Sequence, residues 1–281
     1  NDVDRSFTDV TIAAGVRNGD WGWGAAMFDY DNDGDLDITM TNGFIDGDQY
    51  ASDPMRLWEN DGSGVFSEIG AVAGVDDEGQ GRGLLTFDFD RDGDLDIFVV
   101  NNGQQPVLLE NNGGNHNNRL RVTTVGRFSN RDGIGALITV TPDESNPDAF
   151  AVWETNAGTH YLAQSEFTAH FGLGPAVETV DRVEILWPSG VQQALRNVPA
   201  NSELIVVEVS GDFNADGIAD GLDREIWAAG FASSGPAITI GDGDADADLD
   251  ADGRDYLWWQ RGYNGEGAAD AVAVPEPGGL A

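Results

Sequence analysis

A nine-residue acidic motif, present twice at an offset of 59 residues, constrains this chain more than any other feature. The motif Asp-x-Asp-x-Asp-Gly-x-x-Asp occupies residues 29–37 and again 88–96. Carboxylates at every second position, with a glycine that turns the chain, can converge on Ca²⁺, a hard cation that takes about 6–8 oxygen ligands. We therefore predict two calcium loops. Their ligand positions, with Asp35 and Asp94 acting through the backbone carbonyl, are Asp29, Asp31, Asp33, Asp35 and Asp37, then Asp88, Asp90, Asp92, Asp94 and Asp96.

The two loops differ from EF-hands at their C-terminal ends. An EF-hand loop needs an acidic ligand at its twelfth position, and counting from the first aspartate of each motif gives Met40 and Val99. Each motif runs instead into an apolar, β-rich segment, at 36–41 and 95–100. We therefore predict loop-then-strand calcium sites. The alternative is a solvated acidic turn, which the double occurrence of the whole pattern disfavours.

Composition excludes some classes of partner. The net charge of −36, from 50 acidic against 14 basic residues, argues against nucleic acid and anionic membrane surfaces. Such acidity can indicate disorder, but 40% hydrophobic residues and eight tryptophans provide a core, and no cysteine is present to form a disulfide. The chain has no initiator methionine, signal peptide or membrane-spanning apolar run. We expect a fragment or processed chain, which would reach a membrane only through a C-terminal anchor that is missing.

The acidic loops belong to a longer internal repeat within residues 1–116. Residues 7–16 match 66–75, and Gly-x-x-x-Phe precedes each loop at 24–28 and 83–87. Several short strands in a unit of this length suggest β-propeller blades or a related array. The units resemble FG-GAP/VCBS repeats, the calcium-loop blades of integrin-type propellers. Because two blades cannot close a ring, either more blades precede Asn1 or the two blades lean on the next domain.

Residues 117–209 change character to apolar strands with period-two alternation, which predicts an antiparallel β-sandwich-like domain. The segment resembles the ASPIC/UnbV domain of the cartilage acidic protein family, although the resemblance supplies no biochemical role. The residues that carry it are 130–136 (Asn-Arg-Asp-Gly-Ile-Gly-Ala), 161–165 (Tyr-Leu-Ala-Gln-Ser), 170–174 (His-Phe-Gly-Leu-Gly), 181–190 (Asp-Arg-Val-Glu-Ile-Leu-Trp-Pro-Ser-Gly) and 197–201 (Asn-Val-Pro-Ala-Asn).

A second duplication occupies residues 210–265. Residues 212–223 form a twelve-residue loop followed by a predicted helix, with Leu222, Ile226 and Trp227 as an apolar stripe and Gly230 as its end. The second copy is placed by the helix residues, which recur at an offset of 32. The predicted calcium ligands are Asp212, Asn214, Asp216, Ile218 through its carbonyl, Asp220 and Asp223, then Asp244, Asp246, Asp248, Asp250, Asp252 and Asp255.

This pair of loop–helix units resembles a type I dockerin, the module that docks bacterial cell-surface and polysaccharide-degrading proteins onto cohesins. Two departures matter. The turn residue Gly217 becomes Leu249, and the positions that read cohesin are Gly221-Leu222 and Gly253-Arg254 rather than the hydroxyl pair of that family. Calcium binding therefore carries over better than cohesin binding. In the tail, Val-Pro-Glu-Pro at 274–277 resembles the start of a PEP-CTERM sorting signal, a bacterial exosortase address.

No catalytic constellation is present in the sequence. There is no His-Glu-x-x-His, no Gly-x-Ser-x-Gly and no phosphate-binding glycine loop, and the three histidines lack zinc spacing. Trp21, Trp23, Tyr161 and Trp187 could form a sugar-binding face, but blade or sandwich core is the favoured interpretation.

The sequence therefore predicts a mainly β protein: calcium-loop propeller-type blades at 1–116, a sandwich-like domain at 117–209, a small α-helical dockerin-like module at 210–265 and a flexible tail at 266–281. We expect a secreted or cell-surface bacterial calcium-binding scaffold without enzymatic activity. The alternative is an accessory part of an extracellular polysaccharide-degrading system. The expected partners are a cell-surface or cohesin-like protein, or a glycan.

Overall fold

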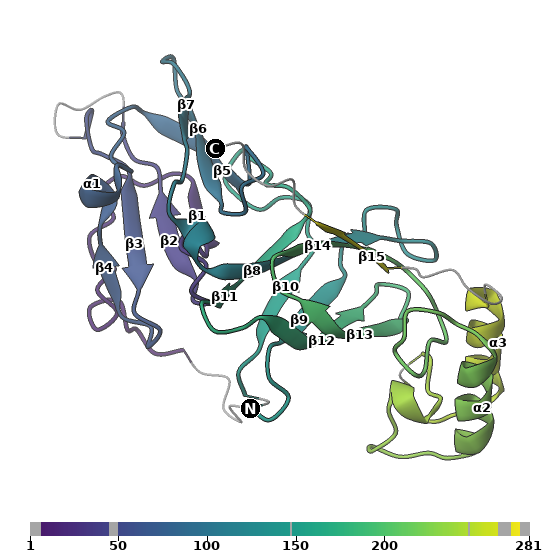
Figure 1. Ribbon diagram of the computed structural model, residues 1–281. Helices are drawn as coiled ribbons and strands as arrows, with labels where there is room; N and C mark the ends of the chain where they lie inside the picture. The colour runs from purple at the N-terminus through teal and green to yellow at the C-terminus, as the bar shows by residue number, and fades with distance from the viewer. Residues whose placement is uncertain (1–6, 45–49, 147, 247, 264–270, 276–281) are drawn as a thin grey trace.

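The computed structural model describes residues 7–44, 50–146, 148–246, 248–263 and 271–275, the last as backbone only. The fold is mainly β, as predicted, with several antiparallel sheets and a small helical region near the C-terminal end. Its parts succeed one another along the chain: two blade-like sheets, a sandwich of two further sheets, and a pair of helices beyond the sandwich (Figure 1).

The first blade-like sheet is a four-stranded antiparallel meander whose strands pair in chain order. The first acidic loop joins its first two strands, so the loop-then-strand prediction is correct here. The short helix α1 (Gly70–Ala73) comes after the sheet. The strands are β1 (Ala25–Phe28), β2 (Asp37–Met40), β3 (Arg56–Asn60) and β4 (Phe66–Glu68).

The second blade-like sheet has three strands, β5 (Gly81–Phe87), β6 (Asp96–Asn101) and β7 (Val107–Leu109), and the 3₁₀ turn η1 (Gly114–His116) comes after it. The second acidic loop joins β5 to β6. Within the described residues the two sheets close no ring. They share one apolar core instead, formed by Ala26, Phe28, Met55, Leu57, Val75, Leu84, Leu95, Ile97 and Val99.

The sandwich consists of two four-stranded sheets, ordered β10-β9-β12-β13 and β11-β8-β14-β15. The inward side chains of both sheets form the largest core of the chain, and Trp187 lies within it at 1% exposure, so this tryptophan belongs to no sugar-binding face. The strands are β8 (Asn118–Val125), β9 (Leu137–Thr141), β10 (Ala151–Glu154), β11 (Ala169–Gly174), β12 (Thr179–Leu186), β13 (Gln192–Pro199) and β14 (Ser202–Val207).

Two features of the sandwich correct the sequence analysis. Strands β8 and β14 pair in parallel, although β14 follows all four strands of the other sheet along the chain. Part of the tail predicted to be flexible forms strand β15 (Ala271–Pro275), which pairs antiparallel with β14. An edge strand presents unpaired N–H and C=O groups, and an extended segment can satisfy them. Residues 276–277 of the sorting motif lie outside the described part of the chain.

The C-terminal helices end at the glycines that the duplication predicts, and each begins within the last three residues of its predicted loop. Helix α2 (Gly221–Gly230) and helix α3 (Gly253–Gly262) are offset by 32 residues, and the 3₁₀ turn η2 (Ile240–Asp242) lies between them. Ile226 and Trp227 pack on the small core of this module, as predicted. Leu222 does not, because it lies in the first turn of α2 and is 58% exposed.

The sandwich contacts the blades through the connection between β10 and β11. His160 lies with Nδ1 3.1 Å from the carbonyl oxygen of Ala25, at the start of β1. The Oγ of Ser165 accepts a hydrogen bond from the backbone N–H of Thr86 in β5, at 3.0 Å. Next to them, the Tyr161 ring packs 5.6 Å from that of Trp23. The first strands of both blades thus contact the sandwich. This agrees with one of the two predicted alternatives, in which the two blades lean on the next domain.

Strand β11 approaches the first acidic loop so closely that only glycine fits at position 172. A Cβ there would lie 1.9 Å from Oδ2 of Asp29 and 2.7 Å from the Cα of Asn32. We expect Gly172→Ala to lower the free energy of unfolding by about 1–3 kcal/mol, since the loop or the strand must shift. Gly221→Ala, at the exposed start of α2 with open space around it, is the control and should not destabilise the chain. Urea denaturation measures both, and equal effects would contradict the close approach.

Candidate metal centres

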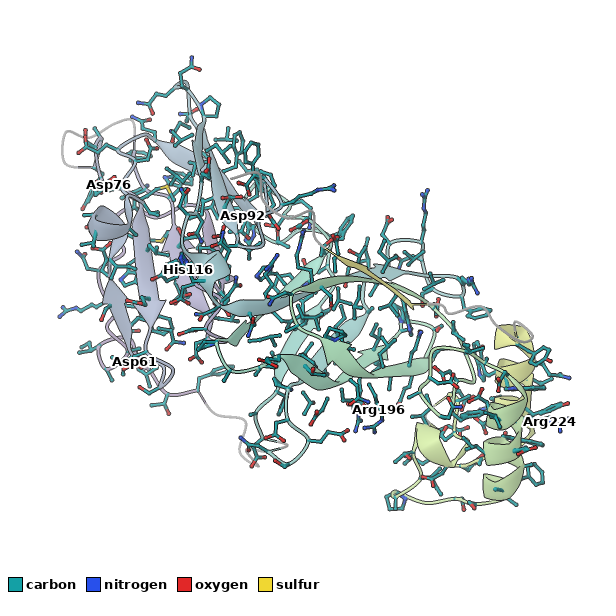
Figure 2. All side chains as sticks on the ribbon, viewed as in Figure 1. Asp61, Asp76, Asp92, His116, Arg196 and Arg224 are labelled. Carbon is teal, nitrogen blue, oxygen red and sulfur yellow. The ribbon has the colours of Figure 1, made fainter. Side chains whose placement is uncertain are left out.

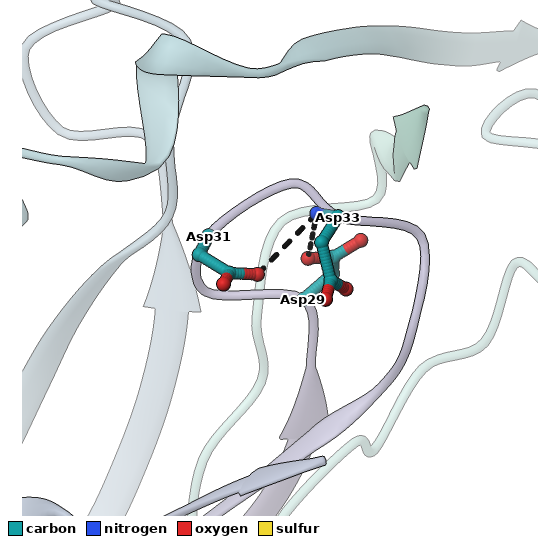
Figure 3. Close-up of side chains that lie close together, drawn as sticks. All are labelled: Asp29, Asp31 and Asp33. Carbon is teal, nitrogen blue, oxygen red and sulfur yellow. Dashed lines mark hydrogen bonds between the residues drawn. The ribbon is translucent and has the colours of Figure 1, made fainter. Parts of the chain in front are cut away.

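The first acidic loop folds so that its carboxylates converge. One oxygen each of Asp29, Asp31 and Asp33 lies within 4.8 Å of the other two (Figure 3). The loop is held by its own backbone, because Asp29 accepts hydrogen bonds from the N–H groups of Asp33 at 3.1 Å and Gly34 at 2.9 Å. Gly34, which was predicted to turn the chain, has a φ of 101°, a conformation that favours glycine.

The last aspartate of each blade motif ties its loop to the end of the next strand along the sheet or to the residues just after it. Asp37 accepts hydrogen bonds from the N–H groups of Tyr30 at 3.1 Å and Asn60 at 2.8 Å. Asp96 does the same with Phe89 at 2.7 Å and Asn111 at 2.8 Å. These residues therefore have a structural role beside the predicted ligand role.

The second acidic loop brings together a different set, Asp88, Asp90 and Asp96. Asp94 is fully buried, and its Oδ2 accepts the N–H of Asn115 at 3.1 Å, whereas its Oδ1 has no hydrogen-bond partner among the described residues. A buried carboxylate oxygen without a donor is costly, and a cation would satisfy it. The remaining predicted ligands of the blade loops, which lie outside the two converging groups, are Asp35, Asp37, Asp92 and Asp94.

The two C-terminal loops have the register that their helices predict. Asp212 accepts the N–H of Gly217 at 2.9 Å, and Asp244 accepts that of Leu249 at 3.0 Å, an offset of 32 in both partners. Leu249 adopts a φ of 71° against 89° for Gly217, so the leucine occupies the left-handed conformation. Phe213 and Ala245 likewise donate to equivalent aspartates, Asp223 and Asp255, both at 2.7 Å.

The ninth residue of each C-terminal loop also caps a helix. Asp220 accepts the N–H of Leu222 at 2.7 Å, and Asp252 accepts that of Arg254 at 2.6 Å. In each case the aspartate three residues on completes a capping box. The side chains of Asp216 and Asp248 accept the N–H two residues ahead, at 3.0 and 3.3 Å.

Only the second C-terminal loop forms groups of three acidic side chains among the described residues. The first has Asn214 at its third position, where the second has Asp246. The carboxylate of Asp250, predicted to act through its carbonyl, joins one of the groups, a placement that the sequence analysis missed. The Oδ1 of Asp246 is buried without a hydrogen-bond partner. The groups are Asp244, Asp246 and Asp255, and Asp250, Asp252 and Asp255.

Burial and crowding of like charges raise the pKa values of several loop carboxylates. Burial is the main cause in each case, and neighbouring aspartates add to it. The pKa of Asp29 rises to about 8, and those of Asp37, Asp94 and Asp212 rise to about 7. A bound cation would reverse this effect, because it favours the ionised form.

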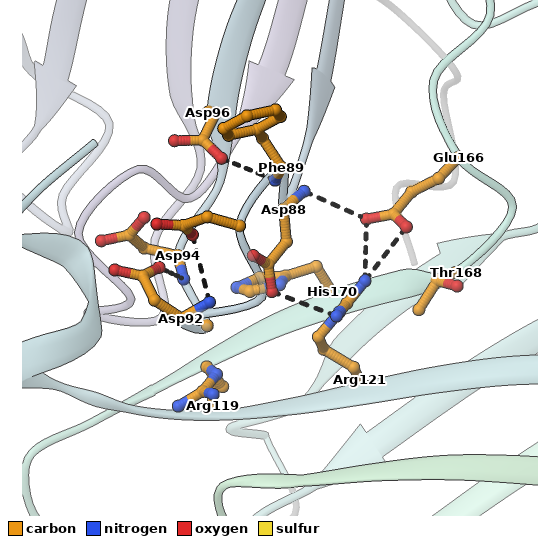
Figure 4. A network of polar contacts seen from close by, with 12 residues as sticks. Asp88, Phe89, Asp92, Asp94, Asp96, Arg119, Arg121, Glu166, Thr168 and His170 are labelled. Atoms are coloured by element: carbon orange, nitrogen blue, oxygen red, sulfur yellow. Dashed lines mark hydrogen bonds and ion pairs between the residues drawn. The ribbon is translucent and has the colours of Figure 1, made fainter. Parts of the chain in front are cut away.

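The sequence analysis missed the residues of the sandwich that face the blade loops. Arg121 of β8 lies between Asp88, with Nη1 3.1 Å from Oδ2, and Glu166, with Nη2 3.0 Å from Oε2 (Figure 4). His170 of β11 lies with Nε2 2.6 Å from Oδ1 of Asn32. The signal that could have found them is the alternation of Arg119 and Arg121, which places both arginines on one face of a strand.

Comparison with known proteins identifies two segments. Residues 45–99 match the model of the FG-GAP-like repeat, and residues 126–212 match that of ASPIC and UnbV. Cartilage acidic protein 1 of Homo sapiens is 30% identical over 197 residues, which cover 68% of this chain and 28% of the relative. The Mus musculus protein of that name is 30% identical over 64% of this chain and 27% of its own length.

The chain thus carries an FG-GAP-like repeat followed by an ASPIC/UnbV domain, which confirms that part of the predicted order. Its similarity to cartilage acidic protein 1 is distant, and the match spans little more than a quarter of those relatives. Among the described residues, no helix has the length and apolar character needed to cross a membrane.

The left-handed Leu249 makes the two C-terminal loops unequal. A leucine in this conformation costs roughly 1–2 kcal/mol, more than the about 0.5–1 kcal/mol entropic cost of glycine. We expect the 212–223 loop to fill with Ca²⁺ before the 244–255 loop, and Leu249→Gly to tighten the second site. Calorimetric calcium titration measures this, with Gly217→Ala as the reciprocal control that weakens the first site. Weaker or unchanged binding in Leu249→Gly would refute the strain argument.

The raised carboxyl pKa values predict how stability depends on pH in metal-free buffer. Between about pH 4 and pH 8 the folded chain binds more protons than the unfolded chain, so its free energy of unfolding falls as pH rises. The melting temperature should therefore drop from pH 5 to pH 8 without metal, and Asp29→Asn should flatten the slope. Excess Ca²⁺ should remove or reverse the trend, because it binds the deprotonated ligands. A melting temperature that rises with pH in metal-free buffer would contradict the assignment.

Proposed function

We propose that this chain, with its FG-GAP-like repeat and ASPIC/UnbV domain, is part of an extracellular, calcium-dependent binding scaffold without enzymatic activity. One observation supports calcium above all: acidic side chains from short loops converge within 4.8 Å of one another on folded, hydrogen-bonded backbone. Every ligand atom in these groups is a carboxylate oxygen, which suits a hard cation. Ca²⁺ accommodates the irregular geometry of such loops better than Mg²⁺, which demands a near-ideal octahedron.

The residues of the first blade loop would have different roles in holding the ion. Asp29, Asp31 and Asp33 supply charge, and the N–H groups of Asp33 and Gly34 fix the orientation of the Asp29 carboxylate. The bound ion would supply the positive charge that keeps these buried carboxylates ionised. Asp37 connects the loop to strand β3 through Asn60, so a filled loop would hold the first blade together.

The absence of catalysis is also a proposal, and the contacts of one serine–histidine pair support it. Ser165 Oγ lies 2.8 Å from Nε2 of His160, a distance that a nucleophile and its base would have. Ser165 is only 7% exposed, however, and its Oγ accepts the N–H of Thr86. The pair therefore serves as a link between the sandwich and the blades.

The C-terminal module suggests how the protein would attach to its partner. Two loop–helix units related by 32 residues, each with a capping aspartate, are consistent with a dockerin-like module that docks the protein to a cohesin-like partner on a bacterial surface. The tail motif suggests sorting to that surface. The same module is also compatible with a docked accessory role in polysaccharide breakdown, and a glycan would then be the ligand. Pull-down with cohesins and binding to glycan arrays would separate the two roles.

Calcium should stabilise the folded chain. An ion that binds only the native state adds about 2.7 kcal/mol per site at a hundredfold excess over its dissociation constant. We expect a higher melting temperature in millimolar Ca²⁺ than in chelator, and a smaller increase in Mg²⁺ at the same concentration. Differential scanning calorimetry measures both, and coincident melting curves in Ca²⁺ and chelator would rule the structural role out.

A further inference from the structure

The two blade loops share a motif but have different surroundings. The second loop faces two arginines of strand β8. Arg121 forms an ion pair with Asp88 at 3.1 Å, and the exposed fractions of the two side chains are 5% and 0%. Arg119 lies against the turn of the loop, because a Cβ on Gly93 would fall 1.6 Å from its Cζ atom. Both guanidinium groups are therefore directed at the second loop.

The sandwich groups that pack on Asp29 and Asn32 of the first loop are neutral instead. Gly172 packs on Asp29, and His170 lies 2.6 Å from the side chain of Asn32. Burial, with the charges of the nearby arginines, lowers the pKa of His170 to about 3, so the ring is neutral. Glu59 adds a further negative charge next to the loop, where it accepts a hydrogen bond from the hydroxyl of Tyr30. Among the described residues no ion pair joins a carboxylate of this loop to an arginine.

We infer that Arg121, supported by Arg119, is a built-in counter-ion for the second blade loop, so that the first loop depends on calcium for its structure and the second depends on it much less. A buried carboxylate is compensated when it forms an ion pair with good geometry, and it is left uncompensated when its partner is removed. The guanidinium already neutralises Asp88 and would repel an arriving cation. The sandwich, through strand β8, thereby sets the calcium dependence of the blades.

Glu166 fixes the position of the arginine. It holds the other side of Arg121, with both carboxylate oxygens 3.0–3.1 Å from Nη2. Glu166 of the sandwich therefore orients the guanidinium group that contacts Asp88. Lysine could supply the charge but not both contacts in this planar arrangement.

The inference rests on the proposed calcium function, and hydrogen exchange with mass spectrometry on the full chain tests the two separately. We compare peptides covering 29–37 and 88–96 in millimolar Ca²⁺ and in chelator. Chelation should speed exchange of the first peptide by about tenfold or more and that of the second by less than about threefold, since local opening sets the rate. If neither peptide responds, the calcium function fails. If both respond equally, only the counter-ion inference fails.

Substitution of Arg121 gives the second arm of the test. In Arg121→Met the 88–96 peptide should become as sensitive to chelation as 29–37, and the melting temperature should fall more in chelator than in Ca²⁺. Arg121→Lys keeps a positive charge, so the sensitivity of its 88–96 peptide to chelation should lie between those of the wild type and Arg121→Met. This variant remains informative if the methionine variant does not fold. Arg196→Met is the matched control, because Arg196 pairs with Glu144 on the outer sandwich, away from the blades (Figure 2). Equal losses in Ca²⁺ and chelator for Arg121→Met would overturn the inference.

Discussion

A buried carboxylate needs a positive charge or hydrogen-bond donors nearby. The arrangement of the blades and the sandwich depends on how each acidic loop meets this requirement. Three of the four acidic loops meet part of it locally, by turning backbone N–H groups toward the first aspartate, which is Asp29, Asp212 or Asp244. Asp29 receives such bonds from residues four and five positions ahead, and Asp212 receives the same pair. The donors fix the shape of the loop but leave most of its negative charge uncompensated. The surroundings then decide whether a metal ion or an arginine supplies the rest.

Those surroundings place the blade loops at the junction with the sandwich. Asn32, at a position of the motif with no predicted ligand role, is the residue that joins the parts. Its side-chain amide donates to the backbone carbonyl groups of Gly93 and Gly114, at 3.0 and 3.1 Å. Its own backbone carbonyl accepts the N–H of Gly174 at 2.8 Å. One residue therefore connects both loops and strand β11. Asn32 is fully buried, so these contacts form part of the packed junction between the blades and the sandwich.

Local signals were readable from the sequence, and distant pairings were not. The repeat at an offset of 59 predicted both loops and their strands, and the offset of 32 predicted that Leu249 would occupy a glycine position, because each depends on neighbours in the chain. The parallel pairing of β8 with β14 joins residues about 80 positions apart and leaves no local pattern. Arg121 was missed for the same reason, since its partners Asp88 and Glu166 are distant in sequence.

The parallel pairing of β8 and β14 also determines how the molecule would carry mechanical load. The chain enters β8 from the blades at Asn118 and leaves β14 toward the helical module at Val207, which pairs with Val125 at the far end of β8. Tension between the blades and the helical module therefore pulls the two strands along their length in opposite directions. Loaded in this shear geometry, the hydrogen bonds between the strands share the force and must fail together, whereas a strand peeled from one end would lose them one by one.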